Sequence, residues 1–181
     1  KKSSFSKYIN WKKPQPAKED EINWIHSKKH IQNLKNICNS GGGYLDPDTP
    51  VCSNSFNIAL LAAGAWLDGV DEVINGNHAF ILARPPGHHA EKNNAMGFCL
   101  FSNAALAATY ALKQKNIKKV AIFDWDVHHG NGTQNIVSSN PQIAYSSIHE
   151  FPFYPGTGSQ IEKGDYGNIM NVPISSNLNS T

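Results

Sequence analysis

Apolar runs separated by polar, Gly-rich or Pro-rich stretches divide the chain into segments typical of helices and strands. From Glu21 to Cys38 the apolar residues recur at spacings close to one helical face, and the glycines of "NSGGG" end this predicted helix. Residues 41–55 are rich in Gly, Pro and Asp and predict a loop. Residues 56–74, "FNIALLAAGAWLDGVDEVI", are so rich in Ala and Leu that they predict a core helix.

Strands and helices alternate through the rest of the chain. Strands are predicted at 78–83, 118–126, 142–149 and 168–174, and helices at 101–116 and 132–139. The strands are continuous apolar runs, which is typical of a parallel sheet that is buried on both faces. The predicted fold class is therefore α/β, a mostly parallel sheet with helices on both faces. In such sheets, ligands bind at the carboxyl ends of the strands.

Composition and charge are those of an ordinary folded domain. The 181 residues are 40% hydrophobic and 17% charged, with a formal net charge of +2. A charge this mild, carried by scattered Lys residues, argues against a nucleic-acid groove or binding to an anionic membrane surface. No apolar run reaches the about 18 residues that a membrane helix needs. The Lys-containing segment 1–13 is interpreted as a solvated N-terminal segment outside the domain.

The cysteines indicate a reducing environment. Cys38, Cys52 and Cys99 are far apart in the sequence, form no C-x-x-C pair and are odd in number. This pattern favours free thiols over a disulfide framework or a Cys-based zinc site. We expect an intracellular protein, in the nucleus, the cytoplasm or an organelle.

Three polar clusters each follow directly after a predicted strand. If the three strands are neighbours in the sheet, the clusters converge on one crevice that holds at least four imidazoles and two carboxylates. The first cluster contains Arg84, Pro85, Pro86, Gly87, His88, His89, Gly97, Phe98 and Cys99; the second contains Asp124, Asp126, His128, His129 and Asn131; the third contains Ser147, His149 and Tyr154.

The second cluster has the residue types and spacing of a cation site. Asp126 and His128 are two residues apart, so in an extended segment both point the same way and can bind one cation such as zinc. Asp124 points to that side too, either as a further ligand or to orient a neighbour. The alternative is that the two aspartates only cap the following turn and that His129 is a surface histidine.

The first cluster suits acid/base chemistry. Adjacent histidines cannot face the same way on a strand, but in the turn set by Pro85, Pro86 and Gly87 both His88 and His89 can project into a pocket. Imidazole titrates near neutral pH and can move a proton beside a metal. The alternative interpretation of the pair is surface polarity.

The blocks "RPPGHHAEKNNAMGFCLFSN", "FDWDVHHGNGTQ" and "SIHEFPFYPGTG" resemble those of the zinc-dependent histone deacetylase family, which includes acetylpolyamine amidohydrolases and bacterial deacetylase-like amidohydrolases. "YLDPDTPVCSNSFNIALLAAGA" and "EINWIHSKKHIQNL" resemble its N-terminal region. "HHGNG" and "RPPGHHAE" are most similar to class II and bacterial members. The resemblance covers the chain from about residue 14 and implies an arginase/deacetylase-type α/β fold.

The resemblance also implies the roles of the polar residues. Asp126 and His128 match two of the three zinc ligands, and the tandem catalytic histidines match His88 and His89. Asp124 matches the partner of the first histidine and a ligand of a structural potassium ion, which the Ser147 hydroxyl and the Ile148 carbonyl would also bind. Asn131 matches the partner of the second histidine. Because Asn131 is a neutral amide, we expect His89 to be less basic than in relatives that carry Asp there.

The substrate channel is predicted in the same way. Phe98, which follows Gly97, and Tyr154 match the two aromatic walls of the acyl-lysine channel. Asp48 is a candidate for binding a substrate backbone or an amine at the rim. The alternatives are that the two aromatic side chains pack in the core and that Asp46 and Asp48 only form a turn.

The resemblance has one departure, because the family's third zinc ligand, an Asp, and its oxyanion-binding Tyr have no match in this chain. Asp165 lies in a predicted turn, and Tyr166 lacks the family's Gly-Gly-Tyr context. Residues 14–181 are therefore interpreted as the N-terminal part of one deacetylase domain. The expected function is zinc-dependent removal of acetyl or other acyl groups from lysine side chains of histones or other proteins, which implies a role in chromatin regulation. The alternatives are hydrolysis of acetylpolyamines or small acyl amides, or an inactive module that binds acylated ligands or protein partners.

Overall fold

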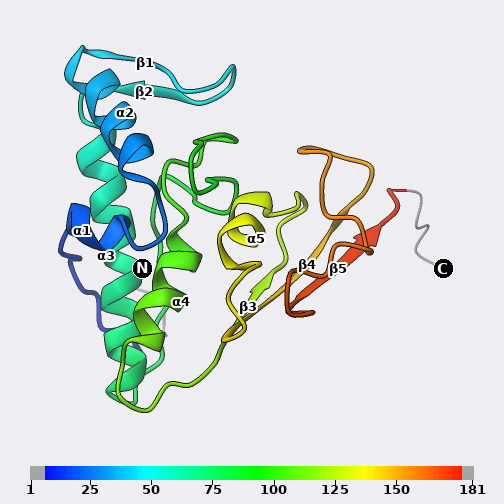
Figure 1. The fold of residues 1–181 in the computed structure, drawn as a ribbon. Helices are drawn as coiled ribbons and strands as arrows, with labels where there is room; N and C mark the ends of the chain where they lie inside the picture. Colours follow the sequence, from blue (N-terminus) through cyan, green and yellow to red (C-terminus); the bar gives the residue numbers. More distant parts are fainter. Residues whose placement is uncertain (1–6, 177–181) are drawn as a thin grey trace.

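The computed structural model describes residues 7–176 and contains an α-helical layer beside a parallel sheet (Figure 1). Helices α1 to α3 and a small hairpin form one side of the molecule, and α4 and α5 lie between them and the sheet. The helices are α1 (Glu19–Ile22), α2 (Lys28–Asn39), α3 (Ser55–Ile74), α4 (Asn103–Leu112) and α5 (Asn131–Val137), and the strands are β1 (Gly42–Tyr44), β2 (Pro50–Cys52), β3 (Val120–Asp124), β4 (Ile143–Glu150) and β5 (Ile169–Ile174).

The parallel sheet has the order β3-β4-β5. Its register pairs Asp124 with Ser147, so the carboxyl end of β3 lies beside the second half of β4. Alternate side chains of β4, among them Ile143 and Tyr145, are buried, and α4 contacts β3 while α5 contacts β4. The loops that follow β3 and β4 are therefore neighbours, as the site prediction requires.

The opposite face of this sheet is exposed in the described part of the chain. Phe123 on β3 is 62% exposed, and Met170 and Val172 on β5 are 56% and 40% exposed. They alternate with less exposed positions of the same strands, and the register aligns Phe123 with Met170 through Ser146, so they share one face. The apolar character on both faces explains why the sequence pattern predicted a sheet covered on both sides.

Residues 12–17 pack along α3. Lys12 forms an ion pair with Glu72, and the Ala17 amide donates to the Leu60 carbonyl at 2.8 Å. A Cβ atom at Gly64 would lie 1.8 Å from the Gln15 carbonyl oxygen, so the close approach of this segment requires glycine there. Residues 1–6 of the predicted solvated segment lie outside the described residues.

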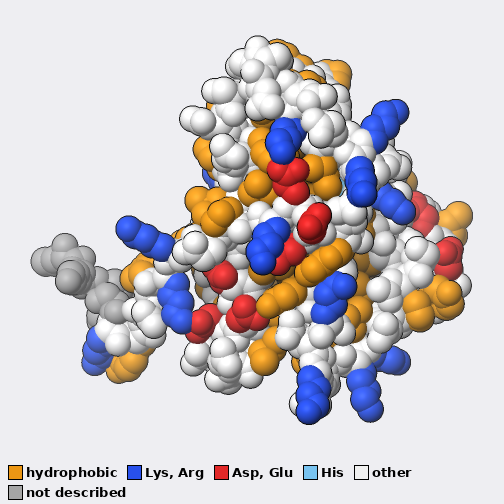
Figure 2. Space-filling model, turned by 60° about the vertical axis from the view of Figure 1, so that its left-hand side comes forward, with side chains coloured by type: hydrophobic (Ala, Val, Ile, Leu, Met, Phe, Trp, Pro, Cys, Tyr) orange, Lys and Arg blue, Asp and Glu red, His pale blue; other side chains and the backbone are white. Residues whose placement is uncertain are grey.

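The charged side chains do not separate by sign on the helical side. Figure 2, turned so that this side comes forward, shows Lys and Arg interspersed with Asp and Glu over that face. Within residues 7–176, no helix is both long and apolar enough to cross a bilayer.

The prediction of one helix from Glu21 to Cys38 was wrong. The structure has two helices, α1 and α2, joined by a turn at 23–27. Ser27 is the N-cap of α2 with an extended backbone, and its hydroxyl accepts from the His30 amide at 3.2 Å. A cap residue has non-helical dihedral angles, so it interrupts a periodicity that continues in the sequence.

Two further local predictions were wrong. The loop predicted at 41–55 contains the antiparallel hairpin β1–β2, with Gly42 opposite Cys52. The segment 78–83 forms no strand, and its Phe80 and Leu82 side chains are 88% and 72% exposed. A strand requires a hydrogen-bonded neighbour, and no described strand is hydrogen-bonded to this segment.

Candidate active site

The two adjacent histidines each have an oxygen partner at Nδ1. His88 Nδ1 lies 3.1 Å from Asp124 Oδ2, and His89 Nδ1 lies 2.8 Å from Asn131 Oδ1. The two imidazole rings are 4.0 Å apart between centroids. The turn after residue 83, the end of β3 and the start of α5 therefore bring together the pairs that the resemblance predicted.

Asp124 is an anchor at the end of β3. Its Oδ2 also accepts from the Tyr145 hydroxyl at 3.1 Å. Burial alone would raise the pKa of the Asp124 carboxyl, but the hydrogen bonds from His88 and Tyr145 hold this pKa below its usual range. Gly130 permits this packing, because a Cβ atom there would lie 2.3 Å from Asp124 Oδ2.

His89 is buried and neutral at pH 7. Burial lowers its pKa to about 4, the neighbouring His88 adds to this effect, and the hydrogen bond with Asn131 acts in the opposite direction. Desolvation is thus the main cause of the low pKa of His89, and the expectation that His89 is less basic than in relatives with Asp at position 131 stays a prediction. Gly97, at φ +56°, belongs to this packing, since a Cβ atom there would lie 2.4 Å from His89 Cδ2.

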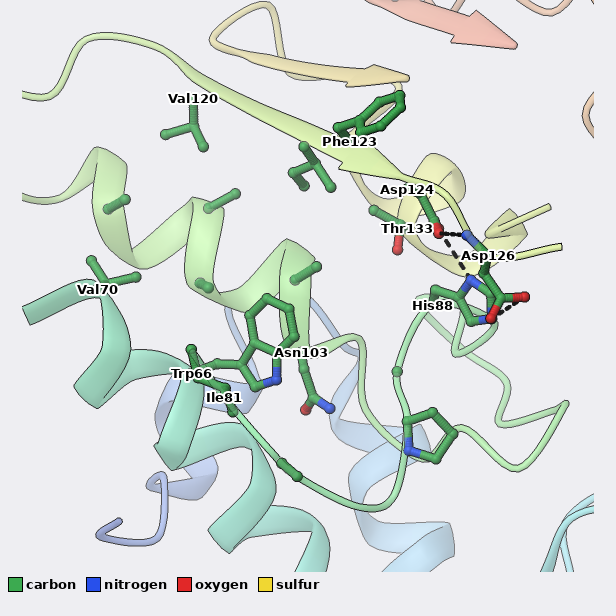
Figure 3. A pocket seen from close by; sticks show the side chains of 18 of the residues that line it. Trp66, Val70, Ile81, His88, Asn103, Val120, Phe123, Asp124, Asp126 and Thr133 are labelled. Atoms are coloured by element: carbon green, nitrogen blue, oxygen red, sulfur yellow. Dashed lines mark hydrogen bonds and ion pairs between the residues drawn. The ribbon is translucent and has the colours of Figure 1, made fainter. Parts of the chain in front are cut away.

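Asp126 and His128 face each other on the turn after β3. His128 Nδ1 lies 3.2 Å from Asp126 Oδ1, and the side chains of His128 and Asp126 are 34% and 49% exposed, respectively. His88, Asp124 and Asp126 lie together at the end of β3 (Figure 3). The Asp126 amide donates to Asp124 Oδ1 at 3.2 Å, and the His128 amide donates to Asp126 Oδ1 at 2.8 Å. The aspartates thus also form the turn, as the alternative interpretation expected.

This pair fits two positions of a zinc site. Carboxylate oxygen and imidazole nitrogen are zinc donors, and two such atoms on one tetrahedral zinc ion stand about 3.3 Å apart, close to the observed 3.2 Å. Catalytic zinc sites use three protein ligands, and no group of three His, Cys, Asp or Glu side chains within residues 7–176 is placed to hold a metal. The Asp126–His128 pair is therefore compatible with two of the three protein ligands of such a site.

Aromatic side chains from the loop after β4 cover the histidines. Tyr154 contacts His89 edge-on with ring centroids 5.1 Å apart, and Phe153 stacks on His128 at 5.1 Å. Burial raises the pKa of the Tyr154 phenol to about 12, and the nearby carboxylates of Asp48 and Asp46 add to this effect. The predicted channel wall Tyr154 and the predicted rim loop therefore adjoin.

Phe98 lies near the same loop in a strained conformation. Its φ of 63° is in the left-handed region, which non-glycine residues rarely adopt. The Phe98 amide donates to Thr49 Oγ1 at 3.1 Å, and its side chain is 57% exposed. Such exposure excludes the core-packing alternative for Phe98.

Ser147 and His149 of the third cluster lie behind the site. Ser147 Oγ is 2.9 Å from His149 Nδ1, whose other ring nitrogen donates to the Gly158 carbonyl at 3.0 Å. His129 is only 1% exposed and contacts Thr157 and Gln134, so the interpretation of His129 as a surface histidine was wrong. The potassium ligands Asp124, Ser147 and Ile148 stay a prediction, with the first two paired across the sheet.

A groove of about 610 Å³ lies between the 81–87 segment and β3. Figure 3 shows Trp66 and Val70 of α3 and Asn103 of α4 on one side and β3 on the other. Its lining is largely apolar, and it ends at His88, Asp124 and Asp126.

The sequence matches the profile of the histone deacetylase domain over residues 1–181. The chain belongs to the histone deacetylase family. A Synechocystis sp. protein named as uncharacterized is 49% identical over 178 residues, which are 96% of this chain and 59% of that protein. The histone deacetylase-like amidohydrolase of Pseudomonas aeruginosa is 37% identical over 165 residues, 88% of this chain and 43% of that protein.

The crystal structure of the HDA15 HD domain matches with a TM-score of 0.85 and 40% identity, over 92% of this chain and 48% of that chain. This match confirms the predicted deacetylase-type α/β fold. The chain spans about half the length of the histone deacetylase relatives that it matches.

Sequence reasoning missed three residues of the candidate site. Phe153 stacks on His128, Thr49 accepts from the Phe98 amide, and Glu91 contacts Asn131. An aromatic residue next to Tyr154 was the only signal for Phe153. Neither Thr49 nor Glu91 belongs to a periodic pattern, and each was found only through its contact.

Proposed function

We propose that the protein is a zinc-dependent amide hydrolase that removes acetyl groups from lysine side chains of proteins, histones included. One observation carries this proposal. Two histidines, each held at Nδ1 by Asp124 or Asn131, lie side by side next to the Asp126–His128 pair. A module that only binds acylated ligands has no use for paired acid/base groups, so this arrangement favours an enzyme.

His89 is the proposed general base. Its Nδ1 is engaged by Asn131, which leaves Nε2 to take a proton from the attacking water and return it to the leaving amine. His88 is held at Nδ1 by the Asp124 carboxylate, which fixes the orientation of its ring beside His89. Tyr154 and Phe98 would hold the aliphatic part of the lysine between aromatic surfaces. Asp48 would bind the substrate backbone at the rim.

Asp126 and His128 would provide two of the zinc ligands. When bound, zinc supplies Lewis acidity toward the amide carbonyl and lowers the pKa of water. Asp124, the Ser147 hydroxyl and the Ile148 carbonyl are the proposed ligands of a structural potassium ion.

A small cationic amide is the second candidate substrate, and the position of Asp46 and Asp48 near Tyr154 favours it. Two carboxylates near the channel wall would attract an amine at the far end of an acetylated polyamine. The name of the Pseudomonas aeruginosa relative, an amidohydrolase, is compatible with either substrate class.

Three measurements on the protein as its host organism produces it test the proposal. They are the hydrolysis of an acetyl-lysine peptide, the hydrolysis of an acetylated diamine, and the content of bound zinc. We expect Asp126→Asn to lower kcat/KM at least about 100-fold and to reduce bound zinc. Asp165→Asn, at an exposed position, is the control and should change neither. Zinc content and hydrolysis that both survive Asp126→Asn would contradict the proposal, and the ratio of the two kcat/KM values decides between the substrates.

A further inference from the structure

A carboxylate lies behind the Asn131–His89 pair. Asn131 Oδ1 is 2.8 Å from His89 Nδ1, and Asn131 Nδ2 donates to Glu91 Oε1 at 2.8 Å. The same Nδ2 is 3.4 Å from Met96 Sδ, a weak acceptor. Asn131 is 7% exposed, so water cannot readily replace these partners, and breaking the hydrogen bonds costs free energy.

Glu91 determines which way round the Asn131 amide lies. An ionised carboxylate only accepts hydrogen bonds, so the Asn131 NH2 group must face Glu91. The carbonyl oxygen of the amide then faces His89. Because that oxygen also only accepts, the hydrogen in the His89–Asn131 bond must be on His89 Nδ1.

Three hydrogen bonds, two to Asn94 and one to His26, hold Glu91 in place. Its backbone amide donates to the Asn94 carbonyl at 2.9 Å, and its Oε2 accepts from Asn94 Nδ2 at 3.3 Å. Its backbone carbonyl accepts from His26 Nδ1 at 2.9 Å. These bonds place the carboxylate before any substrate binds.

We propose that Glu91 is a positioning residue that selects the Nδ1–H tautomer of His89 through the Asn131 amide. This inference rests on the proposed function, in which His89 takes a proton at Nε2. An aspartate at position 131 would accept from His89 with either oxygen and would need no such support. An asparagine has one accepting and one donating end, and the carboxylate behind it decides which end meets the histidine.

The tautomer is measured directly by 15N NMR of the His89 ring in the chain at pH 8, where the two ring nitrogens give well-separated shifts. We expect Nδ1–H in the wild type. Glu91→Lys replaces an acceptor with a donor, so the Asn131 amide should turn over and the majority of His89 should change to Nε2–H. Glu91→Met keeps the length of the side chain without a strong acceptor, and a mixture of the two tautomers is expected.

A double variant supplies the rescue. In Glu91→Lys with Asn131→Asp, the new carboxylate accepts from both the introduced ammonium group and His89, so the Nδ1–H tautomer should return. Glu19→Lys, at a partly exposed glutamate paired with Lys35, is the control and should leave the His89 spectrum unchanged. Persistence of Nδ1–H in both Glu91→Lys and Glu91→Met, or failure of the double variant to restore it, would overturn the inference.

Kinetics separate this inference from the proposed function. If the wild-type protein hydrolyses an acetyl-lysine peptide, Glu91→Lys should lower kcat about 10- to 100-fold with KM changed less than about twofold, and the double variant should recover most of kcat. If the wild type hydrolyses no acyl amide, the proposed function fails, while the NMR result still decides whether Glu91 sets the tautomer.

Discussion

At the residue scale, one hydroxyl group decides how polar the predicted channel is. Tyr154 contacts both His89 and His128 edge-on, yet its buried hydroxyl has no hydrogen-bond partner among the described residues. A buried hydroxyl without a partner loses its hydration and gains nothing in return. Tyr145, on the neighbouring strand β4, shows the opposite case, because its hydroxyl donates to Asp124 Oδ2 at 3.1 Å.

Removing these two hydroxyls should therefore have different effects. Tyr154→Phe is expected to leave the free energy of unfolding within about 0.5 kcal/mol of the wild type or to raise it, whereas Tyr145→Phe should lower it by about 1–3 kcal/mol. Urea denaturation of both variants measures the difference. Equal losses in the two variants would show that the Tyr154 hydroxyl has a partner in solution.

His26 makes stability depend on pH. Its Nδ1 donates to the Glu91 carbonyl, and its Nε2 accepts from the Ser102 amide at 2.9 Å, so both ring nitrogens are used only in the neutral form. Burial lowers the pKa of His26 from 6.5 to about 3, and the neighbouring His30 adds to this effect. Between these values the unfolded chain binds a proton that the folded chain does not.

The stability from neutral His26 is therefore fully present above pH 6.5 and is lost as the pH falls toward 3. One proton corresponds to about 1.4 kcal/mol per pH unit. His26→Gln should be less stable than the wild type at about pH 7.5 but should lose stability less steeply between about pH 6.5 and 4.5. Urea denaturation at several pH values gives both slopes, and identical slopes would contradict the assignment.

At the element scale, long apolar runs predicted helices and strands correctly. Short runs, and runs with no strand to pair with, did not. The core helix predicted at 56–74 is α3, Ser55–Ile74, and the strand predicted at 142–149 is β4, Ile143–Glu150. The segment 78–83 has a strand-like composition but no strand paired with it in the described chain, and pairing cannot be read from one segment alone. In the site, Asp124 was already singled out by the residue pattern, the roles of Asp124 and Asn131 as partners of the two histidines came from the family resemblance, and Glu91 was found only from its contact.

The break between α1 and α2 should respond to a single cap residue. Ser27 accepts from the His30 amide, which is one of the amides that a helix leaves without a partner at its start. Ser27→Ala should lower the free energy of unfolding by about 0.5–2 kcal/mol. Ser40→Ala, at the other end of α2, removes only an exposed bond to the Ile37 carbonyl and is the control, with a smaller loss expected. Equal losses in thermal or urea unfolding would contradict the capping role.

At the scale of the whole molecule, two apolar surfaces lie on either side of β3. One is the groove between β3 and the 81–87 segment, and the other is the exposed sheet face with Phe123 and Met170. Both surfaces lie next to the site, because β3 ends at Asp124. The histone deacetylase relatives are about twice as long as the matched part.

Exposed apolar faces of this kind promote association. We expect the 181-residue chain in isolation to bind an apolar dye and to self-associate as its concentration rises. Each large apolar side chain that becomes buried contributes about 1.5–3 kcal/mol, so the double variant Phe123→Ser with Met170→Ser should weaken association at least about tenfold. Tyr44→Ser removes a 70% exposed aromatic side chain outside this face and should have little effect. Sedimentation velocity over a concentration series measures all three chains, and a wild-type chain that stays monomeric without binding the dye would show that the face is stable in water.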